Sequence, residues 1–454
     1  MRDEEYSALD ATALAGLVRA GELSADEVLA AATAQHEATH PTINAVVEWY
    51  DEPTPPSPDA DPALSPLAGV PFLRKDYGST EAGRLVEMGS RLAEGVVADT
   101  TSPFFERLAD AGATIVGRTA VPELIQHGTT ESRAFGVTRN PLDPTLSAGG
   151  SSGGAAAAVA ACVVPAAHAS DCAGSIRIPA AACGLVGLKP SRRRVPWPDG
   201  GWGGIAEEFV VTRTVRDAGL FLDVLGDPSV TGGYSRVPER ARIGVSTAHW
   251  AGEPVEPAVV EWTERAAADL EAAGHQVDVV DTPIPDGRLM RTWNAMFSRW
   301  VARDVHDLAE RTGRPIDENT LEPTTLLVVD AVKKLTVDRV TDAQIEQGRI
   351  THDLGAVLAG YDVLLTPTLG RSSIPLDHVH GEIVPFDDYL ERNSALFPYN
   401  FLFNVTGWAS LAVPVDGPAA SALPGSVQLS GRPGTERILL SLAATLEEGR
   451  VASG

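Results

Sequence analysis

Two turns rich in glycine and serine hold the residues of this chain most suited to chemistry. Residues 147–154 read SAGGSSGG, and residues 170–179 read SDCAGSIRIP. The segment between them, residues 155–167, is a run of small apolar residues that predicts one buried helix. The two serine-bearing turns then flank a single apolar element, so their hydroxyl groups can meet in space, as the nucleophile and its activating group must in an active site.

Lys75 is the third residue with a possible chemical role. Of the 36 basic residues in the chain, only four are lysines: Lys75, Lys189, Lys333 and Lys334. A lysine directly after Arg74 therefore stands out in a sequence that prefers arginine. Because a buried lysine can lose its proton whereas an arginine cannot, only the lysine can act as a base.

Other interpretations of the first turn do not fit its neighbours. A phosphate-binding loop needs Gly-Lys-Ser or Gly-Lys-Thr at the helix start, but here Gly154 is followed by four alanines. The G-x-S-x-G elbow of α/β-hydrolases needs a hydrophobic strand before it, and residues 140–146, NPLDPTL, do not form one. No lysine has a serine three residues before it, which excludes the Ser-x-x-Lys motif of β-lactamases.

The Lys75 segment and the two turns, in this order, resemble the amidase signature family of Ser-cisSer-Lys hydrolases. In that family the second serine follows the first by 24 residues, which is the spacing of Ser151 and Ser175. The likeness extends over most of the chain, and residues 175–180, 189–192 and 201–204 are most similar to hydrolases of aminohexanoate cyclic dimers and related hydrophobic amides. The expected function is therefore hydrolysis of the C–N bond of a small, hydrophobic or cyclic amide.

The resemblance implies an α/β fold in which a central mixed β-sheet is covered by helices. Residues 1–454 are expected to form one amidase-signature domain, with the catalytic core at about 65–215 and a variable helical segment beside the pocket at about 289–358. It also implies a cis peptide bond between Gly150 and Ser151. Supporting roles fall to Ser152 and to an ion pair between Asp171 and Arg177.

The chemistry of amide cleavage assigns a role to each catalytic residue. Because an amide is a poor electrophile, the nucleophile must lose a proton as it attacks, and the departing amine must gain one. A neutral Lys75 would take the proton of Ser151, which takes that of the nucleophile Ser175, and the relay then reverses. Backbone N–H groups of Cys172, Ala173, Gly174 and Ser175 are expected to stabilise the oxyanion.

Two residues of the second turn depart from the usual family pattern. Ala173 stands where a glycine is common, and it adds strain of about 1 kcal/mol if that position needs a positive φ. Cys172 could be a thiol nucleophile, but a small buried hydrophobic residue is the favoured interpretation. Nearby, His127 has no assigned role, and His168, with its apolar neighbours, predicts a hydrogen-bonded core histidine.

Aromatic residues supply candidates for the pocket walls. Trp293, Met296, Phe297 and Trp300 are spaced to share one helical face, which is more typical of core packing than of a pocket. Residues 397–408 contain three phenylalanines and are a candidate for a second apolar wall.

The elements that must position these residues follow the pattern of an α/β protein. Asp10 is placed to cap a first helix, and residues 24–27 form a capping box for a second helix that should end before Pro41. Residues 104–116 and 243–280 combine helical and strand patterns and predict β-α-β units.

Composition excludes several classes of protein. A formal charge of −25 argues against nucleic acid as a partner, since phosphate contacts need clustered Lys and Arg. The start of the chain lacks an apolar signal core, and no apolar run is long enough to span a membrane. Three cysteines give no disulfide framework, and no metal-ligand spacing occurs. We therefore expect a cytoplasmic enzyme that needs no metal or cofactor; a homodimer stays open.

Two alternative functions share this motif set. The glutaminase-type subunit of the aminoacyl-tRNA amidotransferases usually has Gln where this chain has Ile178, and the acidic composition also favours a stand-alone hydrolase. An acyltransferase would pass the acyl group from Ser175 to an amine instead of water. No feature of the sequence separates that activity from hydrolysis.

Overall fold

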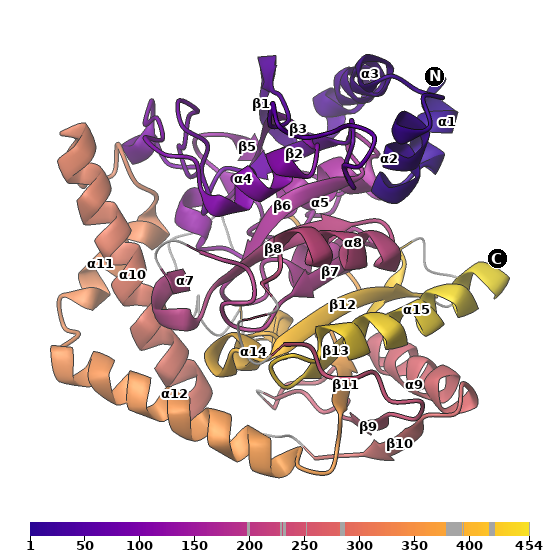
Figure 1. Ribbon diagram of the computed structural model, residues 1–454. Coiled ribbons are helices and arrows are strands. Elements are labelled where there is room, and N and C mark those ends of the chain that lie inside the picture. Colours follow the sequence, from indigo (N-terminus) through magenta and orange to yellow (C-terminus); the bar gives the residue numbers. More distant parts are fainter. Residues whose placement is uncertain are drawn as a thin grey trace.

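One large mixed β-sheet forms the centre of the molecule in the computed structural model (Figure 1). The structure describes residues 1–453 except 198, 199, 228, 230–232, 251, 282–286, 378–392, 394 and 417–422. The sheet has 11 strands in the order β1-β3-β2-β6-β8-β7-β12-β13-β11-β9-β10. These strands are β1 (Val46–Thr54), β2 (Pro71–Lys75), β3 (Thr114–Thr119), β6 (Ala166–Asp171), β7 (Val186–Lys189), β8 (Glu207–Thr212), β9 (Arg242–Val245), β10 (Gln276–Val279), β11 (Val363–Pro367), β12 (Ala409–Val415) and β13 (Gly425–Gly431).

This sheet contains both parallel and antiparallel pairs, grouped in blocks. Strand β2 lies parallel to both β3 and β6, whereas β8, β7, β12 and β13 pair antiparallel with their neighbours. All residues of β2, β6 and β8 are buried, as expected for strands covered on both faces. A separate hairpin joins β4 (Glu131–Ser132) to β5 (Gly136–Val137). The predicted mixed sheet covered by helices is confirmed.

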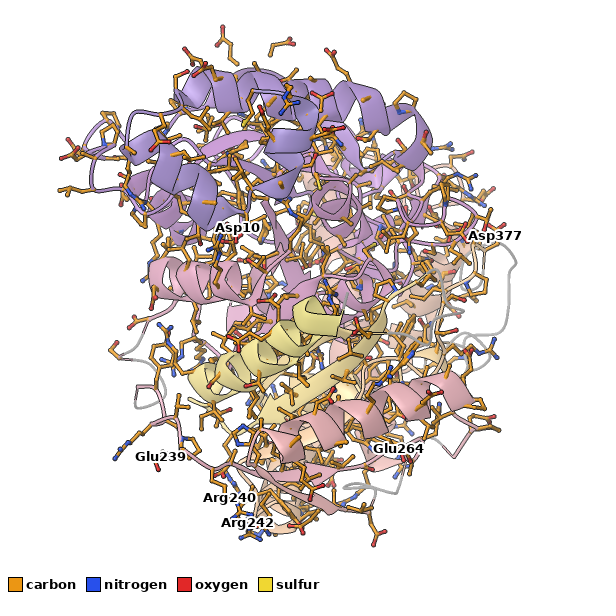
Figure 2. The ribbon with its side chains drawn as sticks, turned by 90° about the vertical axis from the view of Figure 1, so that its right-hand side faces the viewer. Asp10, Glu239, Arg240, Arg242, Glu264 and Asp377 are labelled. Carbon is orange, nitrogen blue, oxygen red and sulfur yellow. The ribbon has the colours of Figure 1, made fainter. Side chains whose placement is uncertain are left out.

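Helices cover both faces and one side of the sheet. Figure 2 shows α8, α15 and α9 next to one another over one face, and it marks Asp10 where α2 meets α8. Figure 1 shows α10, α11 and α12 grouped along one side of the molecule. The helices are α1 (Asp3–Ala8), α2 (Ala11–Arg19), α3 (Ala25–Ile43), α4 (Pro103–Asp110), α5 (Gly153–Ala160), α6 (Arg177–Ala182), α7 (Gly200–Gly204), α8 (Val215–Leu225), α9 (Pro257–Ala272), α10 (Arg288–Thr312), α11 (Pro323–Val332), α12 (Val337–Val357), α14 (Phe401–Thr406) and α15 (Glu436–Ser453).

Several local predictions are confirmed by the helix ends. The Asp10 side chain accepts the N–H of Ala13 at the start of α2, and Ser24 and Glu27 form the capping box of α3. The unit β9-α9-β10 is a β-α-β unit with parallel strands. The expected helical segment at about 289–358 contains α10, α11 and α12.

Two predicted helix boundaries are wrong. The run 155–167 is not one helix, because α5 ends at Ala160 and β6 already begins at Ala166. Cys162 has a φ of 58° and Pro165 lacks an N–H, so the helix cannot continue through them. Helix α3 runs past Pro41 to Ile43, and it ends at Asn44, whose φ of 48° is left-handed. In the last turn of a helix, the ring of a proline costs only one backbone hydrogen bond.

Among the described residues, no helix combines the length and apolar character needed to cross a membrane.

Candidate active site

Lys75 ends the buried strand β2 with its side chain completely enclosed. Its Nζ lies 2.9 Å from Ser151 Oγ, 2.8 Å from Ser152 Oγ and 2.9 Å from Ser170 Oγ. A neutral amine has two N–H donors and one lone pair, so it can donate to two of these hydroxyls and accept from the third. The site therefore suits a lysine that exchanges a proton with a serine.

The environment of Lys75 favours the neutral amine. Burial lowers the pKa of Lys75 to about 7, and the negative charges of Asp171 and Glu208 only partly oppose that shift. No carboxylate forms an ion pair with Nζ within the described part of the chain. An amine with a pKa near neutrality can both accept and return a proton at the pH of the cell.

The first serine turn is held against the residues before it. The Gly150–Ser151 peptide bond is cis, as the resemblance implied. Thr130 Oγ1 donates to the carbonyl of Gly149 at 2.8 Å and accepts the N–H of Gly153 at 3.0 Å. A Cβ at Gly150 would lie 2.4 Å from the carbonyl oxygen of Thr129, so only glycine permits this close approach.

Ser152 and Ser170 tie the two turns together behind the lysine. Ser152 Oγ donates to the carbonyl of Ser170 at 3.2 Å and accepts the N–H of Ser170 at 3.3 Å. Ser152 therefore has contacts that fit the supporting role expected for it, because it links the two turns. No role was predicted for Ser170. The available signal was that it is a third hydroxyl-bearing residue, at the start of the second turn.

Asp171 and Arg177 form the expected ion pair, which is fully buried. The Arg177 guanidinium donates to both carboxylate oxygens of Asp171, each at 2.9 Å. Burial alone would raise the pKa of Asp171, but the charge and hydrogen bonds of Arg177 hold that pKa well below its usual range. The carboxylate also accepts backbone N–H groups of Gly174 at 2.6 Å and Ile176 at 3.2 Å, so it holds the second turn in shape.

This arrangement changes the set of amides available for an oxyanion. The N–H of Gly174 points at Asp171 instead of the substrate side, so the expectation of four free amides is wrong for that residue. Within the described residues, the N–H groups of the other three predicted donors, Cys172, Ala173 and Ser175, donate to no acceptor. Ala173 is absent from the residues with positive φ, whereas Gly174 has φ 117°. The alanine therefore adds no backbone strain, and the glycine stands where the left-handed region requires it.

Ser175 opens onto a small apolar cavity. Its side chain is buried, and among the described residues Ser175 Oγ makes no hydrogen bond. Catalytic hydrogen bonds often tighten only when substrate is bound. The cavity volume is about 30 Å3, which is room for a water molecule or two, so a ring-sized substrate requires the walls to move. The remaining lining is mostly apolar and comes from Ile125, Gln126, His127, Gly128, Cys172, Ala173, Ile178, Met290, Trp293, Phe297, Asn393, Phe397 and Phe401.

Helix α10 forms one wall of this cavity. Trp293 stacks on Phe297 with ring centroids 4.4 Å apart, and it meets Phe401 edge-on at 4.9 Å. Trp293 Nε1 also donates to the carbonyl oxygen of Cys172 at 2.8 Å. Trp293 and Phe297 are buried in the hydrophobic core, which confirms the predicted core packing, and they also line the cavity beside Ser175. The other two aromatic-face residues, Met296 and Trp300, lie beside Gly203 instead.

The surroundings of the other residues singled out in the sequence indicate packing roles. His168 is buried against Phe104 and Phe105, and its Nδ1 accepts the N–H of Lys75 at 3.3 Å, which confirms the core histidine. Burial raises the pKa of the Cys172 thiol to about 12, so the thiol stays protonated and acts as a small apolar residue. Phe397 lines the cavity, as expected for the second wall. Within the described residues, no cluster of three His, Cys, Asp or Glu is placed to hold a metal ion.

The chain is similar to characterised amidases over nearly its whole length. A family model described as Amidase matches residues 27–440. The 6-aminohexanoate-cyclic-dimer hydrolase of Paenarthrobacter ureafaciens is 34% identical over 471 aligned residues, which cover 96% of this chain and 94% of that protein. Lipoamidase of Enterococcus faecalis is 30% identical, with 98% of this chain and 64% of that protein covered.

Solved structures give the same result. A structure of 6-aminohexanoate cyclic dimer hydrolase complexed with substrate superposes with a TM-score of 0.89 at 31% identity and covers 97% of both chains. A bacterial aryl acylamidase superposes with a TM-score of 0.83 at 25% identity, covering 98% of this chain and 97% of the other.

Proposed function

Since this chain belongs to the amidase signature family, whose members hydrolyse amide C–N bonds, we propose that it does so through Ser175 as nucleophile, with Ser151 and Lys75 as its proton relay. The observation that carries the proposal is the enclosed Lys75 amine, 2.9 Å from the Ser151 hydroxyl. Its pKa of about 7 makes a substantial fraction of the amine neutral near pH 7. A proton relay requires a lysine that is neutral near pH 7. If the lysine served only to fill space, burying its amine would cost free energy with no benefit.

The reaction begins when Ser175 Oγ bonds to the carbonyl carbon of the amide. Its proton passes to Ser151 as the proton of Ser151 passes to Lys75 Nζ. The C–N bond of the tetrahedral intermediate then breaks, and the proton returns through Ser151 to the leaving nitrogen. An amine leaves, and the acyl group remains as an ester on Ser175. Water, deprotonated by the same relay, then cleaves this ester and releases the acid.

We expect free backbone amides of the second turn to stabilise the oxyanion. The N–H groups of Cys172, Ala173 and Ser175 have no acceptor among the described residues. Asp171 takes the N–H groups on the other side of that turn, so the free donors keep their direction during the reaction. One preorganised donor typically contributes about 3 kcal/mol to stabilising the transition state.

The substrate is a hydrophobic or cyclic amide. Trp293, Phe297, Phe397 and Phe401 line the same cavity as Ser175 with aromatic rings. Apolar walls stabilise bound substrate by about 25 cal/mol for each Å2 of apolar surface removed from water, so a ring or six-carbon chain contributes a few kcal/mol. A charged α-amino acid would have to lose its hydration there, and the described lining has no pair of opposite charges to receive it. The similar proteins named as 6-aminohexanoate cyclic dimer hydrolases act on a substrate of this class, a cyclic amide.

We place the enzyme in the cytoplasm and expect it to act without nucleic acid. All three cysteines, Cys162, Cys172 and Cys183, are free thiols, which suits a reducing compartment. The formal charge of −25 opposes contact with phosphates.

A substrate panel tests the proposal. We expect kcat/KM for the cyclic dimer of 6-aminohexanoate or for an anilide to exceed that for glutamine by at least about tenfold, which corresponds to 1.4 kcal/mol. Each substrate is measured with and without hydroxylamine as an added acyl acceptor. Faster product formation as the hydroxamate would favour an acyltransferase, and a preference for glutamine, or turnover only with a partner subunit, would favour the amidotransferase alternative.

The nucleophile is tested by Ser175→Ala, with Ser441→Ala as the control at an exposed serine of α15. Ser175→Ala should fold, give no measurable turnover and no longer be labelled by a sulfonyl fluoride, because no acyl-enzyme can form. The control should keep both properties. Residual turnover by Ser175→Ala above the background of an empty preparation would show that Ser175 is not the nucleophile.

A further inference from the structure

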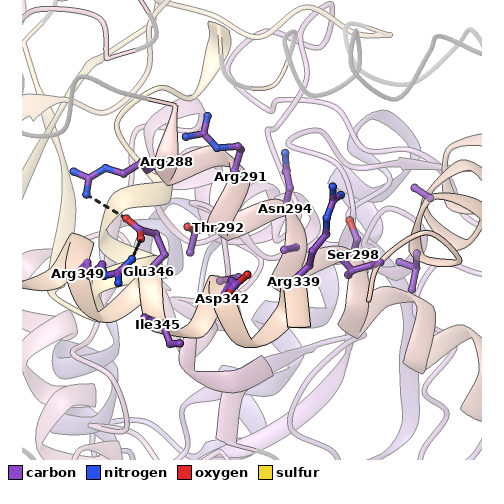
Figure 3. A pocket seen from close by; sticks show the side chains of 15 residues that line it. Arg288, Arg291, Thr292, Asn294, Ser298, Arg339, Asp342, Ile345, Glu346 and Arg349 are labelled. Carbon is purple, nitrogen blue, oxygen red and sulfur yellow. Dashed lines mark hydrogen bonds and ion pairs between the residues drawn. The ribbon is translucent and has the colours of Figure 1, made fainter. Parts of the chain in front are cut away.

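A second hollow lies between α10, α11 and α12, on the side of α10 that faces away from Ser175. Its volume is about 880 Å3, and Figure 3 shows the side chains that line it. Six of these side chains carry charge: Arg288, Arg291, Arg339, Asp342, Glu346 and Arg349. None of them lines the cavity of Ser175. We call this hollow the arginine groove.

The charge of the arginine groove is opposite to that of the whole molecule. Four arginines face two carboxylates, a formal charge of +2, in a chain whose formal charge is −25. A concave surface lined by one excess sign concentrates counter-ions of the other sign. The groove is therefore a place where a small anion is attracted to a protein that repels anions elsewhere.

Two of the four arginines are already paired. Arg288 lies 3.2 Å from Glu346 and 3.0 Å from Asp353, and Arg349 lies 3.1 Å from Glu346. Both oxygens of Glu346 are thus engaged, one by each arginine. These pairs leave little positive charge on Arg288 and Arg349 for a ligand.

The other two arginines have no acidic partner among the described residues. Arg291 on α10 and Arg339 on α12 are both exposed to solvent and form no ion pair in the described part of the chain. Asn294, one helical turn after Arg291, has a buried side-chain oxygen without a hydrogen-bond partner in that same part of the chain. Figure 3 shows the three side chains extending from the two helices toward the same side of the groove.

We propose that the arginine groove binds a small molecule through an oxyanion, a carboxylate or a phosphate, held by Arg291 and Arg339. A planar guanidinium presents two parallel N–H donors that match the two oxygens of such a group, and the two arginines come from different helices, so they can hold it from both sides. The side-chain NH2 group of Asn294, which also lines the groove, is a further donor for such a group, whereas its oxygen can only accept. Apolar groups of Ala295, Val332 and Leu335 offer a place for a short hydrocarbon part of the ligand.

This site is independent of the proposed catalytic function. Trp293 and Phe297 lie on the face of α10 that lines the cavity of Ser175, whereas Arg291 and Asn294 lie on the face that lines the groove. An anion in the groove therefore does not compete with the amide for space. Neither arginine belongs to the catalytic machinery, so its replacement should leave basal amide turnover unchanged.

Calorimetric titration at low ionic strength tests the proposal, with inorganic phosphate and hexanoate as separate probes. The wild-type protein should bind at least one of them at one site per chain. Arg291→Gln combined with Arg339→Gln should weaken that binding at least about tenfold, because the two charged donors are lost. The control is Arg299→Gln with Arg303→Gln, which removes the same charge from the exposed surface of α10 outside the groove; it should change the affinity less than about twofold.

The outcomes separate the alternatives. Tighter binding of phosphate than of hexanoate identifies a phosphate site, and the reverse identifies a carboxylate site. Absence of binding of both probes to the wild-type protein, or an equal loss in the control variant, would overturn the proposal, since the second result would mean a general effect of net charge. Hexanoate could also enter the Ser175 cavity, so its titration is repeated after sulfonyl fluoride labelling, where groove binding should persist. Amide turnover of each variant is measured in parallel, so that a failure of this proposal is not confused with a failure of the catalytic one.

Discussion

At the scale of single residues, Lys75 shows how burial prepares a base. The side chain has no exposed surface, and three hydroxyl groups surround its amine in place of a carboxylate. A carboxylate partner would stabilise the ammonium and raise its pKa, whereas hydroxyls solvate the neutral amine equally well. The result is a lysine that can lose its proton without leaving a buried charge unpaired.

Lys75→Arg should abolish turnover while the protein stays folded. A guanidinium keeps the positive charge but cannot accept the proton of Ser151 near neutral pH. We expect a loss of at least about 100-fold in kcat/KM, the lower range for removal of a general base. Lys333→Arg at an exposed position is the matched control and should match the wild type. If Lys75→Arg remained active, the lysine would serve only as a positive charge.

The pH dependence of kcat/KM should follow the protonation of Lys75. With a pKa of about 7, Lys75 is the inactive ammonium in acid and the active amine in base. Activity toward an uncharged amide should therefore rise with pH, reach half its maximum near pH 7 and level off above it. A rate that stays constant between about pH 5 and about pH 9 would show that no group with this pKa acts as the base.

At the scale of elements, α10 connects the variable helical segment to the catalytic turns. Trp293 Nε1 donates to the carbonyl of Cys172, and Asp304 accepts the hydroxyl of Tyr77 at 2.7 Å. Cys172 directly follows β6, and Tyr77 lies two residues after Lys75 at the end of β2. Any displacement of α10 would therefore act on the turn that holds the proposed nucleophile, Ser175.

Trp293→Phe should lower kcat about fivefold and leave KM nearly unchanged. The phenyl ring still covers the cavity wall, but the hydrogen bond to Cys172 is lost, and such a bond is worth about 1 kcal/mol. Trp300→Phe makes the same replacement on the same helix, outside the cavity, and should have little effect. A rise in KM at constant kcat would instead mean that Trp293 serves only to bind the substrate.

At the scale of the whole molecule, Arg177 joins two halves of the sheet. It bonds to Asp171 at the end of β6, to Gln428 Oε1 of β13 at 3.0 Å and to Asn404 Oδ1 of α14 at 2.7 Å. In the sheet order, β6 and β13 are separated by β8, β7 and β12. The group that shapes the nucleophile turn is therefore also a long-range connection of the fold.

Arg177→Met should reduce the free energy of unfolding by about 3–5 kcal/mol, because it leaves the buried Asp171 carboxylate without its partner. Arg216→Met is the control: this arginine pairs with Asp10, its side chain is 61% exposed, and its loss should cost about 1 kcal/mol or less. Denaturant unfolding curves measure both. Equal stability of the two variants would show that solvent or rearrangement compensates the buried charge.

The sequence alone indicated the candidate site residues of the two turns and several helix ends. Glycines that permit close backbone approach, a lysine in an arginine-rich chain and two serines 24 residues apart can be read from the sequence. Together they indicated Ser151, whose hydroxyl lies 2.9 Å from Lys75 Nζ, and Ser175, which lines the apolar cavity. The capping residues Asp10 and Ser24 likewise act on the helix that follows them, so their effect is readable without the rest of the chain.

Only the tertiary structure decided which groups face the substrate. The direction of the Gly174 N–H depends on where the Asp171 carboxylate lies, and the role of Trp293 depends on how α10, more than 100 residues farther along the chain, docks on the turn after β6. The hydrogen bond of Arg177 to Gln428 of β13 and the groove that Arg291 and Arg339 both line likewise depend on segments that are distant in sequence or lie on separate helices. The spacing of hydrophobic residues shows that a helix has an apolar face, but it does not show what that face covers. The free energy gained by burial depends on the apolar area removed from water, and is about the same for any apolar partner.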